Sequence, residues 1–288
     1  LKPLKEANPD LILGFTGCLA QQEGERFLEK LPFVDLVIGP DGVEHIVRVV
    51  DEVKNKKASV VRTQFDTDIS YKIPELSGET PLNPGSTTFV NIIKGCDKFC
   101  TFCVVPFTRG REKSREAEEI EEEVRLLVSR GAREVVLLGQ NVNAYGKRGL
   151  KRSVPFHELL YRIASIPGLK RLRFTTSHPK DFTRECILAY RDIDILVNHL
   201  HLPVQSGNNR ILNEMRRMHT IEEYISIIEE LKTVVPDMGL STDIIVGYPG
   251  ESESEFEDTL ALMSKIKFNN SYMFSYSPRP NTPAQDFP

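Results

Sequence analysis

Residues 95–103 read GCDKFCTFC and directly follow the apolar run FVNII at residues 89–93. This loop holds three of the five cysteines of the 288-residue chain, Cys96, Cys100 and Cys103, in a C-x-x-x-C-x-x-C spacing. Cysteine is otherwise scarce in the chain, so three thiols this close together indicate a metal site rather than an incidental cluster. We therefore place the chemistry of the chain at this loop.

The number of ligands indicates which kind of metal site the loop forms. A structural zinc ion takes four Cys or His ligands, and neither a fourth Cys nor a His lies within about fifty residues of the loop. Three thiolates can instead hold three corners of a four-iron cluster and leave one iron open to a non-protein ligand. Phe99 and Phe102, on the same loop, can shield such a cluster from water.

From residue 89 onward, apolar strands alternate with amphipathic helices. We expect strands at residues 89–93, 134–138, 172–176, 195–202, 240–246 and 271–276. We expect helices at residues 115–130, 156–165 and 183–190, and after the capping-box signatures that begin at Thr220 and Ser252. This alternation predicts an α/β fold, a partial (β/α)6 barrel of the TIM type, with its chemistry on the loops after the strands.

Residues 1–57 predict part of a smaller, Rossmann-like α/β domain. Strands are expected at residues 11–16 and 34–38, and helices at 22–31 and 42–53, the last with Val43, Ile46, Val47 and Val50 on its buried face. Two strands are too few for a stable parallel sheet, so we expect the chain to begin inside this domain. Residues 58–88 lack periodicity and predict a linker, and residues 89–288 predict the barrel domain.

Polar motifs follow several of the predicted strands, where a barrel places its active site. GQNVN at residues 139–143 follows the second strand of the barrel, TTSHP at 175–179 the third, and LPVQSG at 202–207 the fourth. Arg217 suits the carboxylate of a ligand, because a guanidinium matches a carboxylate better than an ammonium does. His178 in TTSHP is explained equally well by a structural hydrogen bond.

Charge and composition limit the class of protein. The formal net charge of −4 argues against a global basic field, but residues 94–115 are locally basic and include Arg109 and Arg111. These arginines suit nucleic-acid phosphates, although internal ion pairs explain any one of them equally well. No apolar run reaches the length of a membrane span, and unevenly spaced cysteines suit a reducing compartment. We expect a cytoplasmic protein without a membrane segment.

The C-x-x-x-C-x-x-C motif after a strand resembles the radical S-adenosylmethionine (SAM) superfamily. The run GCDKFCTFCVVPFTRGREKSR at residues 95–115 resembles its methylthiotransferase family, and LLGQNVNAYG, FTTSHP, LPVQSGNN and TDIIVGYPGE resemble the branch that modifies adenosine in transfer RNA. The resemblance implies that Cys96, Cys100 and Cys103 hold a [4Fe–4S] cluster that binds SAM and generates a radical. It further implies transfer of a methylthio group to carbon 2 of an isopentenylated adenosine in tRNA, with two SAM molecules used.

The resemblance and the placement of the loops together assign roles to further residues. The predicted SAM contacts are Phe102, Gly139, Gln140, Ser177, Gln205 and Arg217. The predicted substrate or tRNA contacts are Arg109, Arg111, Asn141 and Asn143. Cys18, in TGCLA after the first strand, corresponds to one of three cysteines that hold an auxiliary [4Fe–4S] cluster in the family. The other two are expected upstream of Leu1.

Partners and alternatives follow from the same resemblance. It implies a monomeric enzyme with a reductant such as flavodoxin or ferredoxin, and a C-terminal RNA-binding β-barrel beyond residue 288. Two alternatives share the chemistry but differ in substrate, which would be threonylcarbamoyladenosine in tRNA or an aspartate of a ribosomal protein. A third alternative is a non-catalytic zinc or iron-sulfur module that binds nucleic acid.

Overall fold

The computed structural model describes residues 1–56, 58–65 and 85–288. These residues form two compact units. The first unit contains the described residues up to 65 together with residues 104–110, and the second contains residues 85–103 and 111–288. The short helix α5 (Val105–Arg109), which follows the cysteine loop, therefore belongs to the first unit, where it packs on α2 (Cys18–Glu23). The sequence predicted neither this helix nor its place.

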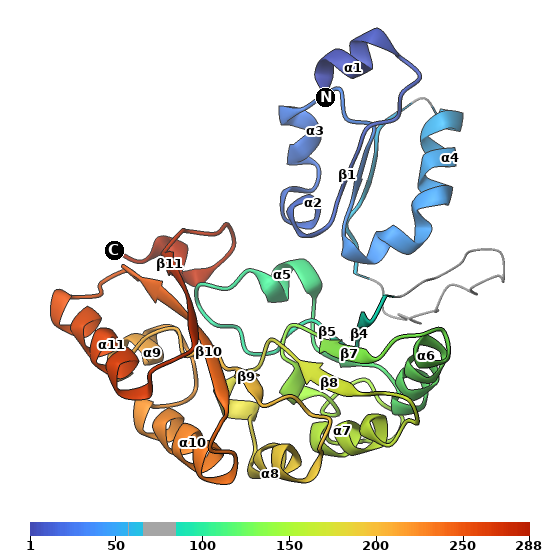
Figure 1. The fold of residues 1–288 in the computed structure, drawn as a ribbon. Coiled ribbons are helices and arrows are strands. Elements are labelled where there is room, and N and C mark those ends of the chain that lie inside the picture. Colours follow the sequence, from blue (N-terminus) through green and yellow to red (C-terminus); the bar gives the residue numbers. More distant parts are fainter. Residues whose placement is uncertain (57, 66–84) are drawn as a thin grey trace. The chain divides into compact units, whose positions relative to one another are not determined.

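The first unit is a three-stranded parallel sheet with helices on both faces (Figure 1). Its strands are β1 (Gly14–Thr16), β2 (Leu36–Ile38) and β3 (Val60–Arg62), in that order. Its other helices are α1 (Lys2–Ala7), α3 (Arg26–Lys30), η1 (Pro40–His45) and α4 (Ile46–Lys56). Because β3 falls inside the predicted linker at residues 58–88, the α/β unit extends further than predicted. Residues 66–84 of that linker lie outside the described residues.

Two helices of the first unit differ from the prediction. The helix expected at residues 22–31 is divided into α2 and α3, because Gly24 adopts a positive φ of 54°. The helix expected at residues 42–53 begins as the 3-10 helix η1 and continues as α4. A 3-10 helix has about three residues per turn, fewer than an α-helix, so the residues that face the core differ from those that an α-helical spacing predicts. Val49 and Val53 are buried, whereas Val47 is 71% exposed.

The second unit contains six parallel strands in chain order (Figure 1). One ladder contains β4 (Thr87–Asn91), β7 (Glu134–Leu138) and β8 (Arg171–Phe174), and the other contains β9 (His199–His201), β10 (Gly239–Val246) and β11 (Asn270–Ser275). Leu172 joins the two ladders: its N–H donates to Ile195 O at 2.7 Å, and its carbonyl accepts from Val197 N at 3.0 Å. The α/β class and the partial (β/α)6 arrangement are confirmed. A short antiparallel pair that was not predicted, β5 (Ile93–Lys94) and β6 (Lys113–Ser114), brackets the cysteine loop in sequence.

Helices cover the outer face of these strands (Figure 1). The long ones are α6 (Ala117–Ser129), α7 (Phe156–Ala164), α8 (Arg184–Asp192), α10 (Ile221–Val234) and α11 (Glu253–Ile266). The same unit also contains four short helices in its connecting and C-terminal segments, α9 (Asn209–Glu214), η2 (Val142–Ala144), η3 (Pro179–Asp181) and η4 (Pro283–Asp286). Both predicted capping boxes form, at Thr220 and Ser252. Within the described ranges, none of the helices has both the length and the apolar character needed to cross a membrane.

A large apolar core lies between the strands and the long helices of the second unit, and a smaller apolar cluster contains Met215 and Tyr248. The spacing of Phe256, Leu260 and Met263 predicts that these residues face the core, but Leu260 is 46% exposed, whereas Leu262 and Ile266 are buried. Thr259 lies on the buried side of α11, where its Oγ1 accepts a hydrogen bond of 2.8 Å from Gly207 N.

Candidate metal centre

The cysteine loop, residues 95–103, is anchored at its start and in its middle. Gly95 has a positive φ of 74°, and its N–H donates to Gln140 Oε1 at 2.7 Å. Thr101 N donates to Met215 O at 3.1 Å. The loop is thus held by the segments that follow β7 and α9.

Thr101 is a residue of the loop that sequence reasoning missed. Its Oγ1 donates to Glu214 O at 2.8 Å and lies 2.7 Å from Tyr248 Oη. Its carbonyl accepts from Ala284 N at 3.0 Å, and the residue is only 1% exposed. A lone hydroxyl inside a cysteine motif gives no sequence signal for this anchoring role.

None of the three cysteines of the loop forms a disulfide bond among the described residues, and Cys100 is buried whereas Cys96 and Cys103 are half-buried. Burial, and to a lesser extent the neighbouring Cys100 and Cys103, raises the pKa of the Cys96 thiol to about 12. This sulfur is therefore protonated at neutral pH unless a metal displaces the proton, as metal binding to thiols requires.

The donor set fits an iron-sulfur cluster. In the part of the chain that the structure describes, no three Cys, His, Asp or Glu side chains converge as the ligands of one metal ion do. A four-iron cluster makes a different demand, because each of three thiolates binds its own iron. Arg217 Nη1 lies 3.7 Å from Cys100 Sγ, and hydrogen bonds to ligand sulfurs help set a cluster's potential.

Buried polar atoms without a hydrogen-bond partner among the described residues occur in the loops after β7, β8 and α9. They are Asn141 Oδ1, both amide atoms of Asn143, Ser177 Oγ, His178 Nε2, Arg217 Nε and His219 Nε2. The rings of His178 and His219 lie 6.0 Å apart, so two of these loops meet. Unpaired polar atoms are costly in a protein interior, and a polar ligand such as SAM would satisfy them.

His178 is not prepared to act as an acid. Its Nδ1 accepts from Lys180 N at 3.2 Å, so Nε2 carries the proton of the neutral ring. Burial first, and then Arg217 and Lys98, lower the pKa of His178 far below its ordinary value. The ring is therefore neutral at physiological pH, and the structural hydrogen bond considered from the sequence is present.

Three of the predicted SAM contacts have structural roles of their own. Gln140 binds the backbone of Gly95, as described above. Gly139 packs so closely that an added Cβ would lie 2.3 Å from Ile93 Cγ2 and 3.0 Å from Ile93 O. Phe102 packs on the apolar cluster that contains Met215. Contact of these three residues with SAM stays a prediction.

The other predicted SAM contacts are buried. Ser177 and Arg217 are each 5% exposed, and Arg217 Nη2 donates to Pro203 O at 2.5 Å. Gln205 is 8% exposed and has a φ of 78°, a conformation that is rare outside glycine and concentrated at functional sites. Its backbone is held on both sides by β10, since it donates to Asp243 O and accepts from Ile245 N, each at 2.9 Å.

The two predicted tRNA-binding arginines belong to different units, since Arg109 ends α5 and Arg111 lies in the second unit. Arg111 Nε lies 2.7 Å from Asp97 Oδ1, and its guanidinium lies 5.0 Å from the ring centre of Phe99. The internal ion pair considered as the alternative is therefore present for Arg111. Its side chain is still 60% exposed, and its contact with tRNA stays a prediction.

The predicted substrate contacts Asn141 and Asn143 are both buried, at 1% and 5% exposure. Asn141 Nδ2 donates to Asp181 Oδ2 at 2.6 Å, which leaves Oδ1 of the same amide for a ligand. Asn143 lies in η2 and lines a pocket of about 260 Å³. The structure therefore gives Asn141 a partner within the protein that the sequence did not predict.

Cys18 is the first residue of α2 and directly follows β1 and Gly17, as predicted. It is half-buried, and it is the one cysteine that the sequence places in residues 1–71 and 104–110. The first unit of this chain therefore supplies one thiol, and a cluster needs further ligands.

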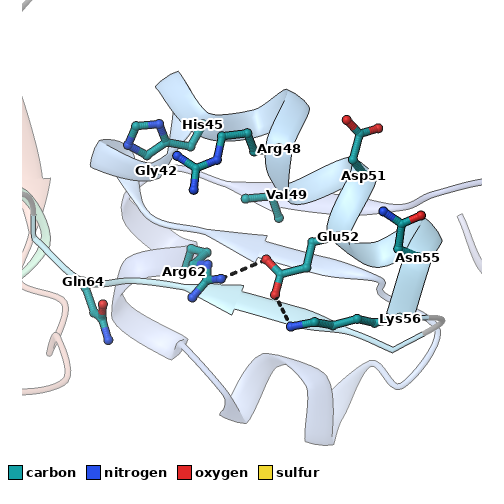
Figure 2. Close-up of a pocket in the computed structure, with 10 residues that line it drawn as sticks. All are labelled: Gly42, His45, Arg48, Val49, Asp51, Glu52, Asn55, Lys56, Arg62 and Gln64. Atoms are coloured by element: carbon teal, nitrogen blue, oxygen red, sulfur yellow. Dashed lines mark hydrogen bonds and ion pairs between the residues drawn. The ribbon is translucent and has the colours of Figure 1, made fainter.

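A separate pocket of about 690 Å³ lies in the first unit, lined by residues of η1, α4 and β3 (Figure 2). Its lining mixes cations and anions, and Glu52 accepts from both Lys56 at 2.6 Å and Arg62 at 2.8 Å. Glu52 therefore pairs with two of the three lining Lys and Arg residues. None of the site residues predicted from the sequence lies in this pocket, and its mixed charge indicates no particular ligand.

Proteins with curated names resemble this chain over its whole length. The full chain is 47% identical to proteins named tRNA-2-methylthio-N(6)-dimethylallyladenosine synthase from Saccharophagus degradans and from Haemophilus influenzae. The alignments cover 100% of this chain but 62% and 60% of those relatives. The chain thus spans about three fifths of the length of the curated relatives that it matches.

Solved structures with a similar fold share little sequence with the chain. The radical SAM methyltransferase TsrM from Kitasatospora setae superposes with a TM-score of 0.70 at 12% identity, over 96% of this chain and 57% of that one. The cobalamin-dependent radical SAM enzyme OxsB gives 0.65 at 13% identity, over 99% and 43%. At such identity the likeness concerns the fold alone. Residues 90–263, more than half of the chain, match the Radical SAM superfamily, and the chain belongs to this superfamily.

Proposed function

We propose that this chain carries the radical chemistry of a methylthiotransferase that modifies carbon 2 of isopentenylated adenosine in tRNA. The observation that carries the proposal is a loop with three thiols, held by hydrogen bonds, near buried polar atoms that have no hydrogen-bond partner among the described residues. The substrate is chosen from relatives 47% identical, whose names specify a 2-methylthio group and an N(6)-dimethylallyladenosine of tRNA.

The cofactors of a radical SAM protein are a [4Fe–4S] cluster and SAM. Cys96, Cys100 and Cys103 would hold the cluster through three of its irons and leave the fourth iron to SAM. Bound at this loop, the cofactors supply a carbon radical able to take hydrogen from an unactivated C–H bond.

The residues around the loop bind and orient the reactants. Arg217 is buried next to Cys100 and supplies the positive charge that would meet the carboxylate of SAM. Ser177 Oγ and the Nε2–H of neutral His178 offer further hydrogen bonds. No general base is needed, because carbon 2 of adenosine has no acidity to exploit.

Contacts with macromolecules belong to the same proposal. Arg109 and Arg111 would meet tRNA phosphates, and Asn141 and Asn143 the substrate nucleoside. Cys18 would be one ligand of an auxiliary cluster that handles the sulfur, together with cysteines outside this chain. A reductant such as flavodoxin or ferredoxin, a monomeric state and a cytoplasmic location complete the proposal.

Anaerobic reconstitution with iron and sulfide tests the first step. The chain is expected to take up about four irons, turn brown and cleave SAM to 5'-deoxyadenosine when reduced. Thiolate-to-iron transitions absorb at about 400 nm, so an absorption band there separates an iron-sulfur site from the zinc alternative. A colourless protein that binds zinc and leaves SAM intact would support the non-catalytic module instead.

The choice of substrate is tested with a full-length relative of this chain, which includes the two fifths of its own length that the chain does not cover. Product is expected with tRNA that carries the isopentenyl group, and none with tRNA from cells that lack it. Product with threonylcarbamoylated tRNA or with ribosomal protein would favour the alternatives. Residues 1–288 alone are expected to cleave SAM without completing sulfur transfer. Apart from the three thiols of the loop and the buried Cys186, they supply only Cys18 as a ligand for the auxiliary cluster.

A further inference from the structure

A buried carboxylate, Asp181, connects three loops of the second unit. Its side chain is 1% exposed and lies at the end of η3, after β8. Lys98 Nζ lies 2.9 Å from its Oδ1 and 2.7 Å from its Oδ2. Asn141 Nδ2 donates to Oδ2 at 2.6 Å, and Lys147 Nζ donates to Oδ1. Lys98 belongs to the cysteine loop, Asn141 and Lys147 lie in the segment after β7, and Asp181 itself lies in the segment after β8. One carboxylate therefore connects these three segments.

The charge on Asp181 is stabilised in spite of burial. Burial acts to raise its pKa, but hydrogen bonds from Lys147, Lys98 and Asn141 outweigh this effect, and the pKa is lowered. The Lys98 side chain is itself only 13% exposed. If the carboxylate were removed, this ammonium would remain buried next to Lys147 without its counter-charge, which is a costly arrangement.

Asp97, which precedes Lys98 in the cysteine loop, forms ion pairs that differ from that of Lys98 in their exposure to solvent. Its carboxylate pairs with Arg111 at 2.7 Å and with Arg148 at 3.1 Å, and these arginine side chains are 60% and 58% exposed. Ion pairs open to solvent contribute little to stability. Asp97 Oδ1 also accepts from Glu112 N at 3.2 Å, a bond that an asparagine at this position can keep. Of the two charged residues between Cys96 and Cys100, Lys98 is therefore the one with a buried ion pair.

We propose that Asp181 is a positioning residue for the metal centre. Through Lys98 it holds the cysteine loop in the conformation that receives the cluster, and through Asn141 it couples this loop to the segment after β7. The inference rests on the proposed function, because it requires that Cys96, Cys100 and Cys103 hold the cluster. It adds a residue that lies 78 positions beyond Cys103 in the sequence and is neither a thiol nor a predicted ligand contact.

Hydrogen exchange of the metal-free chain tests the first part without any cluster. Asp181→Asn is expected to speed exchange of the amides of residues 95–103 by about tenfold or more, the factor that corresponds to about 1.4 kcal/mol. The matched control Asp97→Asn changes a carboxylate in the loop itself and is expected to have a much smaller effect. Equal exchange in Asp181→Asn and the unsubstituted chain would overturn the proposal.

Iron loss tests the second part after anaerobic reconstitution. The rate at which a chelator removes iron is expected to rise about tenfold in Asp181→Asn, by the same conversion, and the electron paramagnetic resonance spectrum of the reduced cluster with SAM is expected to change. Leu160→Ala removes a core side chain of the same unit and serves as the stability control. If Leu160→Ala accelerates iron loss and alters the spectrum equally, Asp181 acts on stability alone and the proposal fails.

Lys98→Met provides a second route, also for the case that Asp181→Asn does not fold. It removes the link to the loop while Asp181 keeps Lys147 and Asn141 as partners. Faster exchange and iron loss are expected, and the double variant Lys98→Met/Asp181→Asn is expected to be no worse than Asp181→Asn. Strictly additive effects would contradict action through Lys98. Failure of the unsubstituted chain to bind iron would contradict the proposed function, whereas the exchange experiment would still decide the role of Asp181.

Discussion

Cys18 comes shortly after β1, and the cysteine loop comes shortly after β4 and the short β5; β1 and β4 each belong to a parallel sheet, yet the two sites differ in their surroundings. Cys18 follows β1 in a three-stranded sheet and is the sole thiol of its unit. The cysteine loop, residues 95–103, lies in a unit of six parallel strands and is bonded to residues that follow β7, β8, α9 and β10.

The difference shows that a strand end by itself does not give a thiol its partners within residues 1–288. In a parallel sheet the carboxyl ends of all strands lie at one edge, so each added strand adds a loop that can reach the same point. The segments after β7, β8 and β10 and the end of α9 give the cysteine loop hydrogen bonds and a counter-charge, whereas Cys18 has no second thiol in the same unit of this chain.

The largest expected effect separates the two kinds of cysteine directly. Cys100→Ala is expected to lose cluster iron and SAM cleavage, because two thiolates cannot replace three. Cys18→Ala in the same chain is expected to keep about four irons and full SAM cleavage. Iron analysis and 5'-deoxyadenosine production after anaerobic reconstitution measure both. A Cys100→Ala chain that still binds about four irons and cleaves SAM would remove the distinction.

A second comparison concerns the two cores. Ile38 in the first unit and Leu160 in the second are both completely buried, and truncation of either to Ala is expected to cost about 2–5 kcal/mol. The core around Ile38 is much smaller, so Ile38→Ala is expected to unfold the first unit while α6, α7 and α10 stay protected from hydrogen exchange. Leu160→Ala is expected to weaken the second unit without this effect on the first. Loss of protection in both units upon Ile38→Ala would show that they unfold together.

A third comparison uses pH, because the pKa of one carboxyl group in the second unit is raised, whereas the pKa of one in the first unit is lowered. Burial first, and then Asp97 and Asp181, raise the pKa of Glu112 from 4.5 to about 7. The folded chain therefore binds more protons at this site between these values, and stability falls as pH rises through the interval. Glu112→Gln is expected to remove that fall in a thermal melt between about pH 5 and about pH 8.

Glu52 in the first unit is the matched control for this titration. Hydrogen bonds from Lys56 and Arg62 lower its pKa from 4.5, so its contribution to stability is present above that value and is lost as pH falls below it. Glu52→Gln is expected to remove stability at neutral pH, the opposite sign to Glu112→Gln. If both variants shift the melting profile in the same direction, the raised pKa of Glu112 is wrong.

The smallest expected effect concerns how helices begin in the two units. Thr220 caps α10 with a complete capping box, whereas α3 follows Glu25 without a side-chain cap. Thr220→Ala is expected to cost about 1 kcal/mol in chemical denaturation. Glu25→Ala is expected to stay within about 0.5 kcal/mol. Equal losses would show that the capping box contributes no more than helix propensity.

Local pattern predicted most elements of the second unit. Residues 134–138 form β7 as expected, and the capping signatures at Thr220 and Ser252 begin α10 and α11. The start of a helix and the extent of a strand depend on neighbours within a few residues, so a short stretch of sequence is sufficient to predict them. The prediction for α11 was wrong at Leu260, and the buried side of this helix includes Thr259, whose hydrogen-bond partner Gly207 lies 52 residues earlier in the chain.

The candidate site divides in the same way. The spacing of Cys96, Cys100 and Cys103 is a local property, and it was sufficient to predict a metal site and its family. Thr101 and Asp181 were not predicted, because a threonine and an aspartate have no distinctive pattern of their own. Their partners Glu214 and Lys98 lie 113 and 83 residues away in sequence.

The sequence by itself therefore determined the thiols, the alternation of strands and helices, and the class of fold. Only the tertiary structure decided that Asp181 is buried against Lys98 and Lys147, that β3 pairs with β2 in the first sheet, and that α5 belongs to the first unit. The physical reason is range. Ligand spacing and helix capping act between residues close in the chain, whereas burial and charge pairing depend on which distant segments the folded chain brings together.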